Sequence, residues 1–359
     1  MKQREALWDV CKALMMLWVV WGHLLPAAMV QQNPYTEPFI SNLKIAVNMP
    51  VFFAISGLLA RRSLESASTG DVIRRLMTWL YPFFTFGIIF AVILGFSQGW
   101  TTSLAIFPFF NVVAGGWFVP TLVVVYFSEA VIFRFVKTER NRVLLTLALY
   151  LAMIIAPTFR VKYSMHMLPY FVFGLFVLPR WPLYRNWRVA IPCGVVLLAS
   201  ALFAGDFAVN GLNFWLVSSY ITDIIGTPCN LFTFFARTFL GFIGIVFVIF
   251  VVDQLLRLWP RAKGLASFGS TTLGVYVVHE WVLYHIRDAH FAVLDFLPIH
   301  WAFRLPFAII VFLVFHYLII AIRRLPRLNA LLFVPPKFFS PFQPGKVGQG
   351  LVSQPPRAI

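Results

Sequence analysis

The sequence has little charge and little cysteine. Of its 359 residues only 12% are charged, against roughly 25% in soluble globular domains, and only 13 are Asp or Glu. This composition excludes an ordinary soluble domain. The three cysteines, Cys11, Cys193 and Cys229, form no CxxC pair. They therefore predict neither a disulfide framework nor a zinc site, and we expect no metal.

Long hydrophobic blocks take up most of the chain. Hydrophobic residues make up 60% of it, and 40 of them are Phe. The blocks are roughly 17–25 residues long, which is the length of helix that crosses a hydrocarbon core of about 30 Å. We therefore predict an all-α, polytopic transmembrane helical bundle with about ten spans, the first of them a retained helix rather than a signal peptide. The spans are expected at 7–30, 43–62, 76–97, 113–135, 143–158, 164–180, 189–205, 230–252, 266–285 and 301–322.

The distribution of positive charge predicts the orientation of the bundle. A net charge of +16 could suit a nucleic-acid binder, but the charges lie between the apolar blocks, so no nucleic-acid partner is expected. Most Lys and Arg residues fall in the alternate segments 1–6, 61–75, 134–142, 180–188, 257–263 and 323–357. Under the positive-inside rule, both the N- and C-termini are cytoplasmic. We expect a transmembrane domain over residues 1–330 and a disordered cytoplasmic tail over 331–359, which is rich in Pro, Gly and Gln.

The first span carries three ionisable residues, Asp9, Lys12 and His23. Each would cost roughly 2.5–3.5 kcal/mol at the centre of a bilayer, so each is a functional candidate. Asp9 and Lys12 are three residues apart and share a helix face. Lys12 and His23 are eleven residues apart, close to three full turns, and lie on nearly the same face about 16 Å apart along the axis. The alternative is that Lys12 snorkels to the interface and His23 only packs.

Three later segments add polar candidates. The second span contains Asn48 and Ser56 in NMPVFFAISG, although close helix packing alone would explain a small residue such as Ser56. Trp117 opens the fourth span. In the ninth, His279 and Glu280 are adjacent, with Tyr276 one turn below Glu280. The alternative for His279 and Glu280 is that both only reach the outer headgroup region.

These motifs, in this order along nearly the whole chain, resemble the membrane-bound acyltransferase family 3. The matching residues are Asp9-Val10-Cys11-Lys12 followed by His23, Met49-Pro50-Val51-Phe52-Phe53 with Ser56-Gly57, Trp117-Phe118, and Gly269 with Leu273, Tyr276 and His279. The branch of fucose 4-O-acetylases and other sugar O-acetyltransferases is the most similar. Two positions depart from the pattern. Many members have His where this chain has Asn48, which cannot act as a base, and the basic residue is often Arg where this chain has Lys12.

The resemblance implies transfer of an acyl group, usually acetyl, from cytoplasmic acyl-CoA to a hydroxyl of an extracytoplasmic or lipid-linked glycan. It implies acetyl-CoA as a donor substrate rather than a permanently bound cofactor. It also implies a multi-pass protein of a plasma membrane such as the bacterial inner membrane, in contact with lipids. The alternative is a transporter or channel without chemistry. The acceptor sugar, the length of the acyl group and the oligomeric state stay open.

Roles follow for the candidate residues. We expect His23 to act as general base on the acceptor hydroxyl, with Glu280 holding its tautomer and His279 nearby in the catalytic group. Asp9 would instead orient Lys12, although whether Glu280 or Asp9 is the partner of His23 stays open. Because acyl-CoA is a polyanion, its phosphates should meet cations near the cytoplasmic side. The expected cations are Lys12, Arg61, Arg62 and Arg75.

Overall fold

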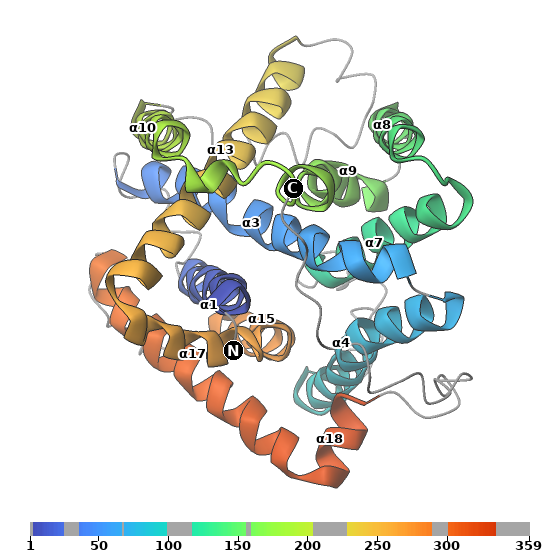
Figure 1. Ribbon diagram of the computed structural model, residues 1–359. Coiled ribbons are helices and arrows are strands. Elements are labelled where there is room, and N and C mark those ends of the chain that lie inside the picture. The colour runs from blue at the N-terminus through green and yellow to red at the C-terminus, as the bar shows by residue number, and fades with distance from the viewer. Residues whose placement is uncertain are drawn as a thin grey trace.

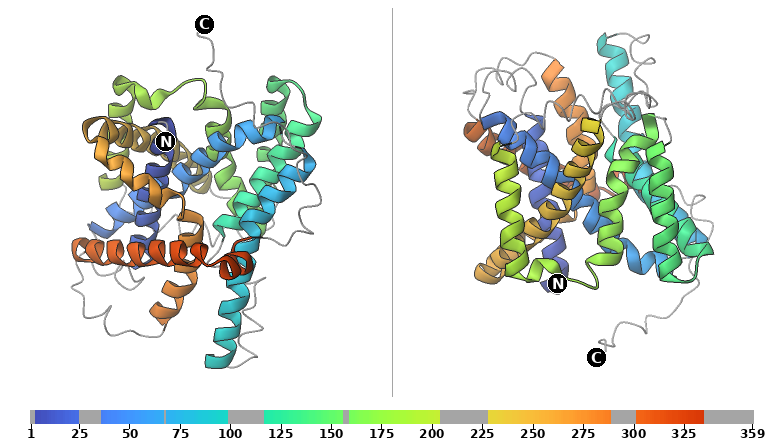
Figure 2. Two further views of the ribbon diagram at one scale, coloured as in Figure 1. Left: turned by 60° about the horizontal axis from the view of Figure 1, so that its bottom comes forward. Right: turned by 90° about the horizontal axis from the view of Figure 1, so that it is seen from above.

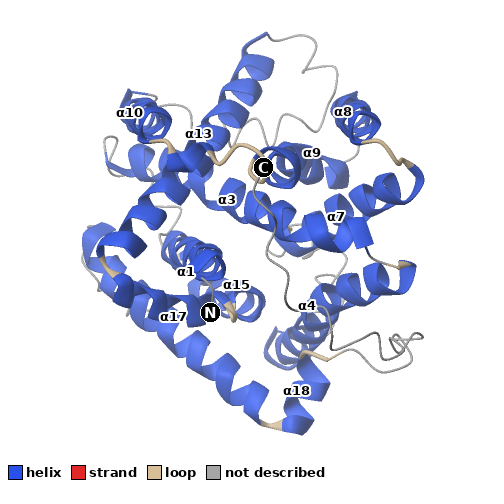
Figure 3. Ribbon diagram, viewed as in Figure 1, coloured by secondary structure: helices blue, strands red, loops and turns tan. Residues whose placement is uncertain are grey.

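The computed structural model describes residues 3–24, 36–66, 68–98, 117–155, 159–203, 228–288 and 301–334. Every regular element within these ranges is helical (Figures 1 and 3). The elements are α1 (Gln3–His23), α3 (Thr36–Ser66), α4 (Thr69–Gln98), α7 (Phe118–Phe135), α8 (Glu139–Ile155), α9 (Phe159–Val172), the π-helix η1 (Phe173–Val177), the 3-10 helix η2 (Leu183–Arg185), α10 (Trp187–Phe203), α13 (Pro228–Leu258), the 3-10 helix η3 (Pro260–Leu265), α14 (Ala266–Gly269), α15 (Thr272–Asp288), α17 (Trp301–Arg324) and α18 (Pro326–Leu332).

The predicted helical class is confirmed, and each of the ten expected segments overlaps a helix. Within the described ranges, four helices are long and apolar enough to cross a membrane, at Thr69–Ile93, Phe118–Phe135, Thr238–Leu258 and Leu305–Arg324. Two apolar stretches are shorter, His166–Val177 and Trp187–Leu202. The number of ten spans and the cytoplasmic termini therefore stay predictions.

Two predicted boundaries meet the limits of the described chain. The first span was expected to reach residue 30, but α1 ends at His23 and residues 25–30 lie outside the described ranges. The domain boundary expected at residue 330 falls inside α18, and residues 335–359 also lie outside the described ranges.

The surface of α17 has the character of a lipid-facing helix. Its exposed side chains include Ile310, Val314, Tyr317 and Leu318, which recur three or four residues apart along one face. In water such a face would be a large apolar patch, whereas in a bilayer it needs no cover. The left-hand view of Figure 2 shows α17 (red) running across the bundle to α18, next to α4.

Helix α1 lies in the interior of the bundle. In Figure 1 it is surrounded by α3, α13, α15 and α17, all of which contact it. Val10, Cys11, Met16 and Val19 have no exposed surface. A helix that is apolar almost all round is stable only when other helices cover it, and this explains its central place. The side chains of Asp9, Lys12 and His23 on this helix are partly buried.

Two glycines allow neighbouring helices to approach closely. A Cβ on Gly269 would lie 2.2 Å from the backbone oxygen of Asp9, so α14 rests directly on α1. A Cβ on Gly57 would lie 1.9 Å from the backbone oxygen of Phe171, so α3 rests on the end of α9. Real Cβ atoms do not come this close to backbone, so a side chain at either glycine would push apart the two helices that meet there.

The contact at Gly57 gives a stability prediction. Gly57→Ala should lower the free energy of unfolding in detergent by about 1–3 kcal/mol, the usual range for overpacking a tight interior. Thermal denaturation followed by loss of the monodisperse peak in chromatography would measure it. The matched control is Gly264→Ala, because a Cβ there meets nothing within 4 Å. Equal melting temperatures for the two variants would contradict the close contact between α3 and α9.

Candidate active site

A cavity of about 220 Å³ lies where α1, α3, α4, α7 and α15 meet. It is lined by Lys12, Met16, Met49, Phe52, Ser56, Leu59, Arg75, Trp79, Phe118, Leu122, Thr272, Leu273 and Tyr276. Most of this wall is apolar or aromatic, and its two charged members are both cations, Lys12 and Arg75. The cavity is therefore suited to a slender apolar ligand that carries negative charge at one end.

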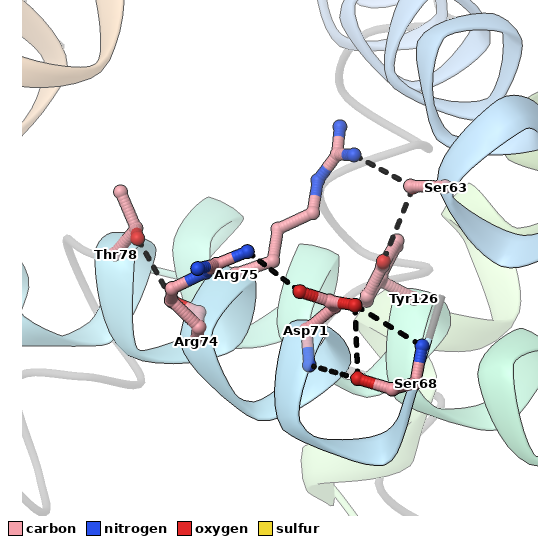
Figure 4. A network of polar contacts seen from close by, with 7 residues as sticks. All are labelled: Ser63, Ser68, Asp71, Arg74, Arg75, Thr78 and Tyr126. Carbon is pink, nitrogen blue, oxygen red and sulfur yellow. Dashed lines mark hydrogen bonds and ion pairs between the residues drawn. The ribbon is translucent and has the colours of Figure 1, made fainter. Parts of the chain in front are cut away.

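Arg75 is held by a polar network that Figure 4 shows from close by. Its guanidinium donates to Ser63 Oγ at 2.6 Å, and Ser63 Oγ lies 3.3 Å from the Tyr126 hydroxyl. The guanidinium carbon also lies over the rings of Trp79, at 5.5 Å, and Tyr126, at 5.3 Å. These contacts come from α3, α4 and α7. They fix the direction of the side chain and leave its positive charge uncancelled by a carboxylate among them.

Asp71 sits next to this network without neutralising Arg75. Its carboxylate accepts from the Ser68 backbone and hydroxyl at 3.1 and 2.9 Å, and from Arg74 at 2.6 Å. Together these contacts cap the start of α4. Arg74 is therefore engaged at the surface, while its neighbour Arg75 turns to the cavity.

Lys12 is positioned by Asp9, one turn earlier on α1. The two form an ion pair of 2.6 Å, and both side chains are partly exposed. An exposed pair of this kind contributes only about 0–1 kcal/mol to stability. Its effect is rather to hold the ammonium group on the face of α1 that lines the cavity.

A row of rings joins the cavity to two histidines. The Phe118 ring lies 5.7 Å from that of Phe52 and 5.0 Å from that of Tyr276. Tyr276 lies 5.4 Å from His279, and His279 lies 5.2 Å from His23 in an edge-on arrangement of 86°. The structure therefore brings together two histidines that are 256 positions apart in the sequence, beyond the end of the cavity formed by Tyr276.

The tautomer of His279 follows from its backbone contacts. Its Nδ1 lies 2.7 Å from the Tyr276 carbonyl oxygen and 3.1 Å from that of Val275. A carbonyl oxygen only accepts, so Nδ1 carries the proton, and in the neutral ring Nε2 holds the lone pair. His279 is also fully buried. It is thus a rigid acceptor aimed away from its own helix backbone.

Other predicted residues are placed away from the cavity. Arg61 donates to Glu65 at 3.0 Å and to the Leu175 carbonyl at 3.3 Å, and it lies 3.8 Å from Glu139. Arg62 is exposed. Neither lines the cavity. These two arginines belong to the surface at the end of α3, where ion pairs occupy Arg61.

The remaining predicted residues divide in the same way. Ser56 and Tyr276 line the cavity. Asn48 is buried one turn beyond Phe52 on α3. Trp117 precedes α7 and packs edge-on against Phe118, with ring centroids 6.5 Å apart, without lining the cavity. Glu280 belongs to α15, but its side chain lies outside the described part of the chain.

Sequence reasoning missed the residues that support Arg75. Ser63 and Tyr126 come from separate helices, and no spacing in the sequence connects them to it. Trp79 could have been found, because it lies four residues after Arg75 on one helix, the spacing at which side chains meet. An Arg and a Trp at that spacing form a cation–π pair often enough to be noted.

The comparisons with known proteins add one finding. The sequence profile of a family described as an acyltransferase domain matches residues 6–323. The matched region includes most of α1 and all of α3, α4, α7 and α15, and hence every residue of the cavity wall. Neither the curated proteins nor the solved structures gave a match.

Proposed function

Since the chain belongs to acyltransferase family 3, whose profile covers nearly all of it, we propose that it is an integral membrane O-acyltransferase. It moves an acyl group, acetyl in our proposal, from cytoplasmic acyl-CoA to a hydroxyl of an extracytoplasmic or lipid-linked glycan. The membrane would be a bacterial inner membrane. The observation that carries this proposal is the cavity with two cations on its wall, joined by aromatic rings to two adjacent histidines.

The cavity supports a donor site. Its volume of about 220 Å³ is smaller than the roughly 300–1,000 Å³ of typical sites for whole drug-sized ligands. That size suits the thin acyl-pantetheine arm, with the nucleotide end of the donor remaining outside. Lys12 and Arg75 would bind phosphate or pull the polyanionic donor inward, because charge-assisted hydrogen bonds to phosphate are among the strongest in proteins. The thioester would then reach the end of the cavity formed by Tyr276.

The two histidines support the chemical step. His23 takes the proton from the acceptor hydroxyl as its oxygen bonds to the thioester carbonyl carbon. When the carbon–sulfur bond breaks, the imidazolium returns that proton to the CoA thiolate, which leaves as the thiol. His279, with Nδ1–H tied to its own helix, offers Nε2 as an acceptor that would orient the ring of His23. Glu280 stays a proposed second partner for that ring.

The orientation of the bundle is part of the proposal and has its own test. With the native cysteines replaced, single cysteines at residues 140 and 260 should be protected from a membrane-impermeant maleimide on intact cells. Cysteines at residues 210 and 290 should react. The physical reason is that Lys and Arg gather at the cytoplasmic ends of the spans. Protection at 210 together with reaction at 140 would show that the bundle has the opposite orientation. A cytoplasmic donor could then not approach the side of the bundle that is rich in Lys and Arg.

The decisive experiment for the function is thioester cleavage by the purified protein. With acetyl-CoA and lipid-linked or soluble glycans from the same membrane, the protein should release free CoA thiol and transfer labelled acetyl to glycan. Slow release of CoA thiol without glycan, with water as the acceptor, would also agree with the proposed function. A protein that carries glycan across vesicles without cleaving any acyl-CoA would instead be a transporter.

A further inference from the structure

Asn48 is a buried polar side chain on helix α3. It is 2% exposed, and within the described part of the chain neither its Nδ2 nor its Oδ1 has a hydrogen-bond partner. Leaving such an amide unpaired costs roughly 1–3 kcal/mol, whereas an apolar residue of the same shape would cost little. A buried, unpaired amide near a cavity therefore indicates a hydrogen bond that forms only with a ligand.

Helix register places Asn48 at the histidine end of the cavity. It lies four residues before Phe52 and eight before Ser56, and both of these line the cavity. Residues four apart share a helix face, so Asn48 continues the cavity-lining face of α3 by one turn. The direction is away from Ser63, the residue of α3 that holds Arg75.

The histidines lie beyond the cavity in the same direction. His279 follows cavity-lining Tyr276 by three residues on α15, and His23 follows cavity-lining Met16 by seven on α1. Both intervals keep the residue on the same helix face. Three helices thus carry Asn48, His279 and His23 past one end of the cavity, which is where a thioester held by Lys12 and Arg75 would present its carbonyl.

We propose that the Asn48 amide donates a hydrogen bond to the oxygen of the acyl group as that oxygen becomes an oxyanion. This inference rests on the proposed function. When the acceptor oxygen bonds to the carbonyl carbon, the carbonyl π pair moves onto oxygen, and the Asn48 Nδ2–H stabilises that charge. When C=O re-forms, the carbon–sulfur bond breaks and the CoA thiolate takes the proton from the imidazolium. An amide suits this role because it always carries its N–H and cannot take the proton from the base.

The test uses Asn48→Leu, which keeps the shape of the side chain and removes the donor. The melting temperature should stay the same or rise, because a buried unpaired amide is lost. Donor affinity should stay the same, while kcat should fall by about 10²–10³, the usual effect of losing one oxyanion donor. The fall should appear both in transfer and in acetyl-CoA hydrolysis, since both pass through the same oxyanion. Asn48→Asp, which has no N–H when ionised, should lose at least as much.

A control and the contrary outcomes complete the test. Thr146→Val also alters a buried polar group, the hydroxyl that donates to Glu129 at 2.9 Å, but lies outside the cavity. It should lower the melting temperature and leave kcat unchanged. An unchanged kcat in Asn48→Leu would overturn the inference. A raised KM for the glycan acceptor with a normal rate of acetyl-CoA hydrolysis would also overturn it, because Asn48 would then bind the glycan rather than the oxyanion. Parallel losses of rate and melting temperature in Asn48→Leu would also overturn it, by making the residue structural. If the wild-type protein cleaves no acyl-CoA, the proposed function itself is wrong, and this result is distinct from those of the Asn48 variants.

Discussion

His23→Ala is expected to lower the rate of acyl transfer by at least two orders of magnitude. A general base contributes about 10²–10⁴-fold, and without it the acceptor hydroxyl must lose its proton unaided. Binding of the donor should stay near that of the wild type, because His23 does not line the cavity that would hold it. Initial rates with saturating acetyl-CoA, together with donor affinity from equilibrium binding, would separate the two effects.

His279→Ala is the comparison that gives this result its meaning. If His279 orients His23 through its fixed tautomer, its loss should reduce the rate less than the loss of His23. The double variant should then be no slower than His23→Ala alone, because residues that act as one unit are not additive. If His23→Ala stays active while His279→Ala is inactive, the base belongs to α15 and the assignment to α1 is wrong.

Lys12→Ala is expected to weaken binding of acyl-CoA by about 1.5–3 kcal/mol, the range for a hydrogen bond to a charged group. That corresponds to roughly a tenfold to 150-fold increase in Kd. Lys12→Arg should retain much of the affinity, because the charge is kept. Equilibrium binding of a non-hydrolysable acyl-CoA analogue would measure all three proteins without interference from turnover.

Two further variants separate a local from a general effect. Lys263→Ala removes an exposed lysine of η3 that does not line the cavity, and affinity should not change. Asp9→Asn releases Lys12 from its ion pair and removes a negative charge, so affinity should hold or increase. If these substitutions acted by disturbing the fold at this end of α1, both Lys12→Ala and Asp9→Asn would weaken acyl-CoA binding. Unchanged affinity in Lys12→Ala would exclude Lys12 from the donor site.

The helical part of the fold could be predicted from the sequence because bilayer thickness sets the length of apolar blocks. That Lys12 and His23 share a helix face could be predicted from their spacing of eleven residues. In the structure both lie near α15, because Lys12 lines the cavity together with Tyr276 and the ring of His23 contacts that of His279. These predictions depend on geometry within one helix, which spacing determines.

The choice among the arginines could not be predicted in the same way. Arg61 lies at the end of one apolar block and Arg75 just before the start of the next, and each belongs to a pair of adjacent arginines. What separates them is tertiary: Glu65 and Glu139 engage Arg61, while Ser63, Trp79 and Tyr126 hold Arg75 at the cavity. The contact between His23 and His279 has the same origin, since the close approach of Gly269 to Asp9 brings α14, and with it α15, against α1. Contacts between helices leave no periodic signal.

Mapping the adduct of bromoacetyl-CoA tests most directly whether the acyl group of the donor reaches the two histidines through the cavity. A nucleophile beside the acyl group displaces bromide and becomes alkylated, and mass spectrometry identifies the residue. We expect alkylation of His23 or His279, prevented by excess acetyl-CoA and slowed in Lys12→Ala. Alkylation only at cysteines or surface residues, unaffected by acetyl-CoA, would contradict a donor path from Lys12 to the histidine pair.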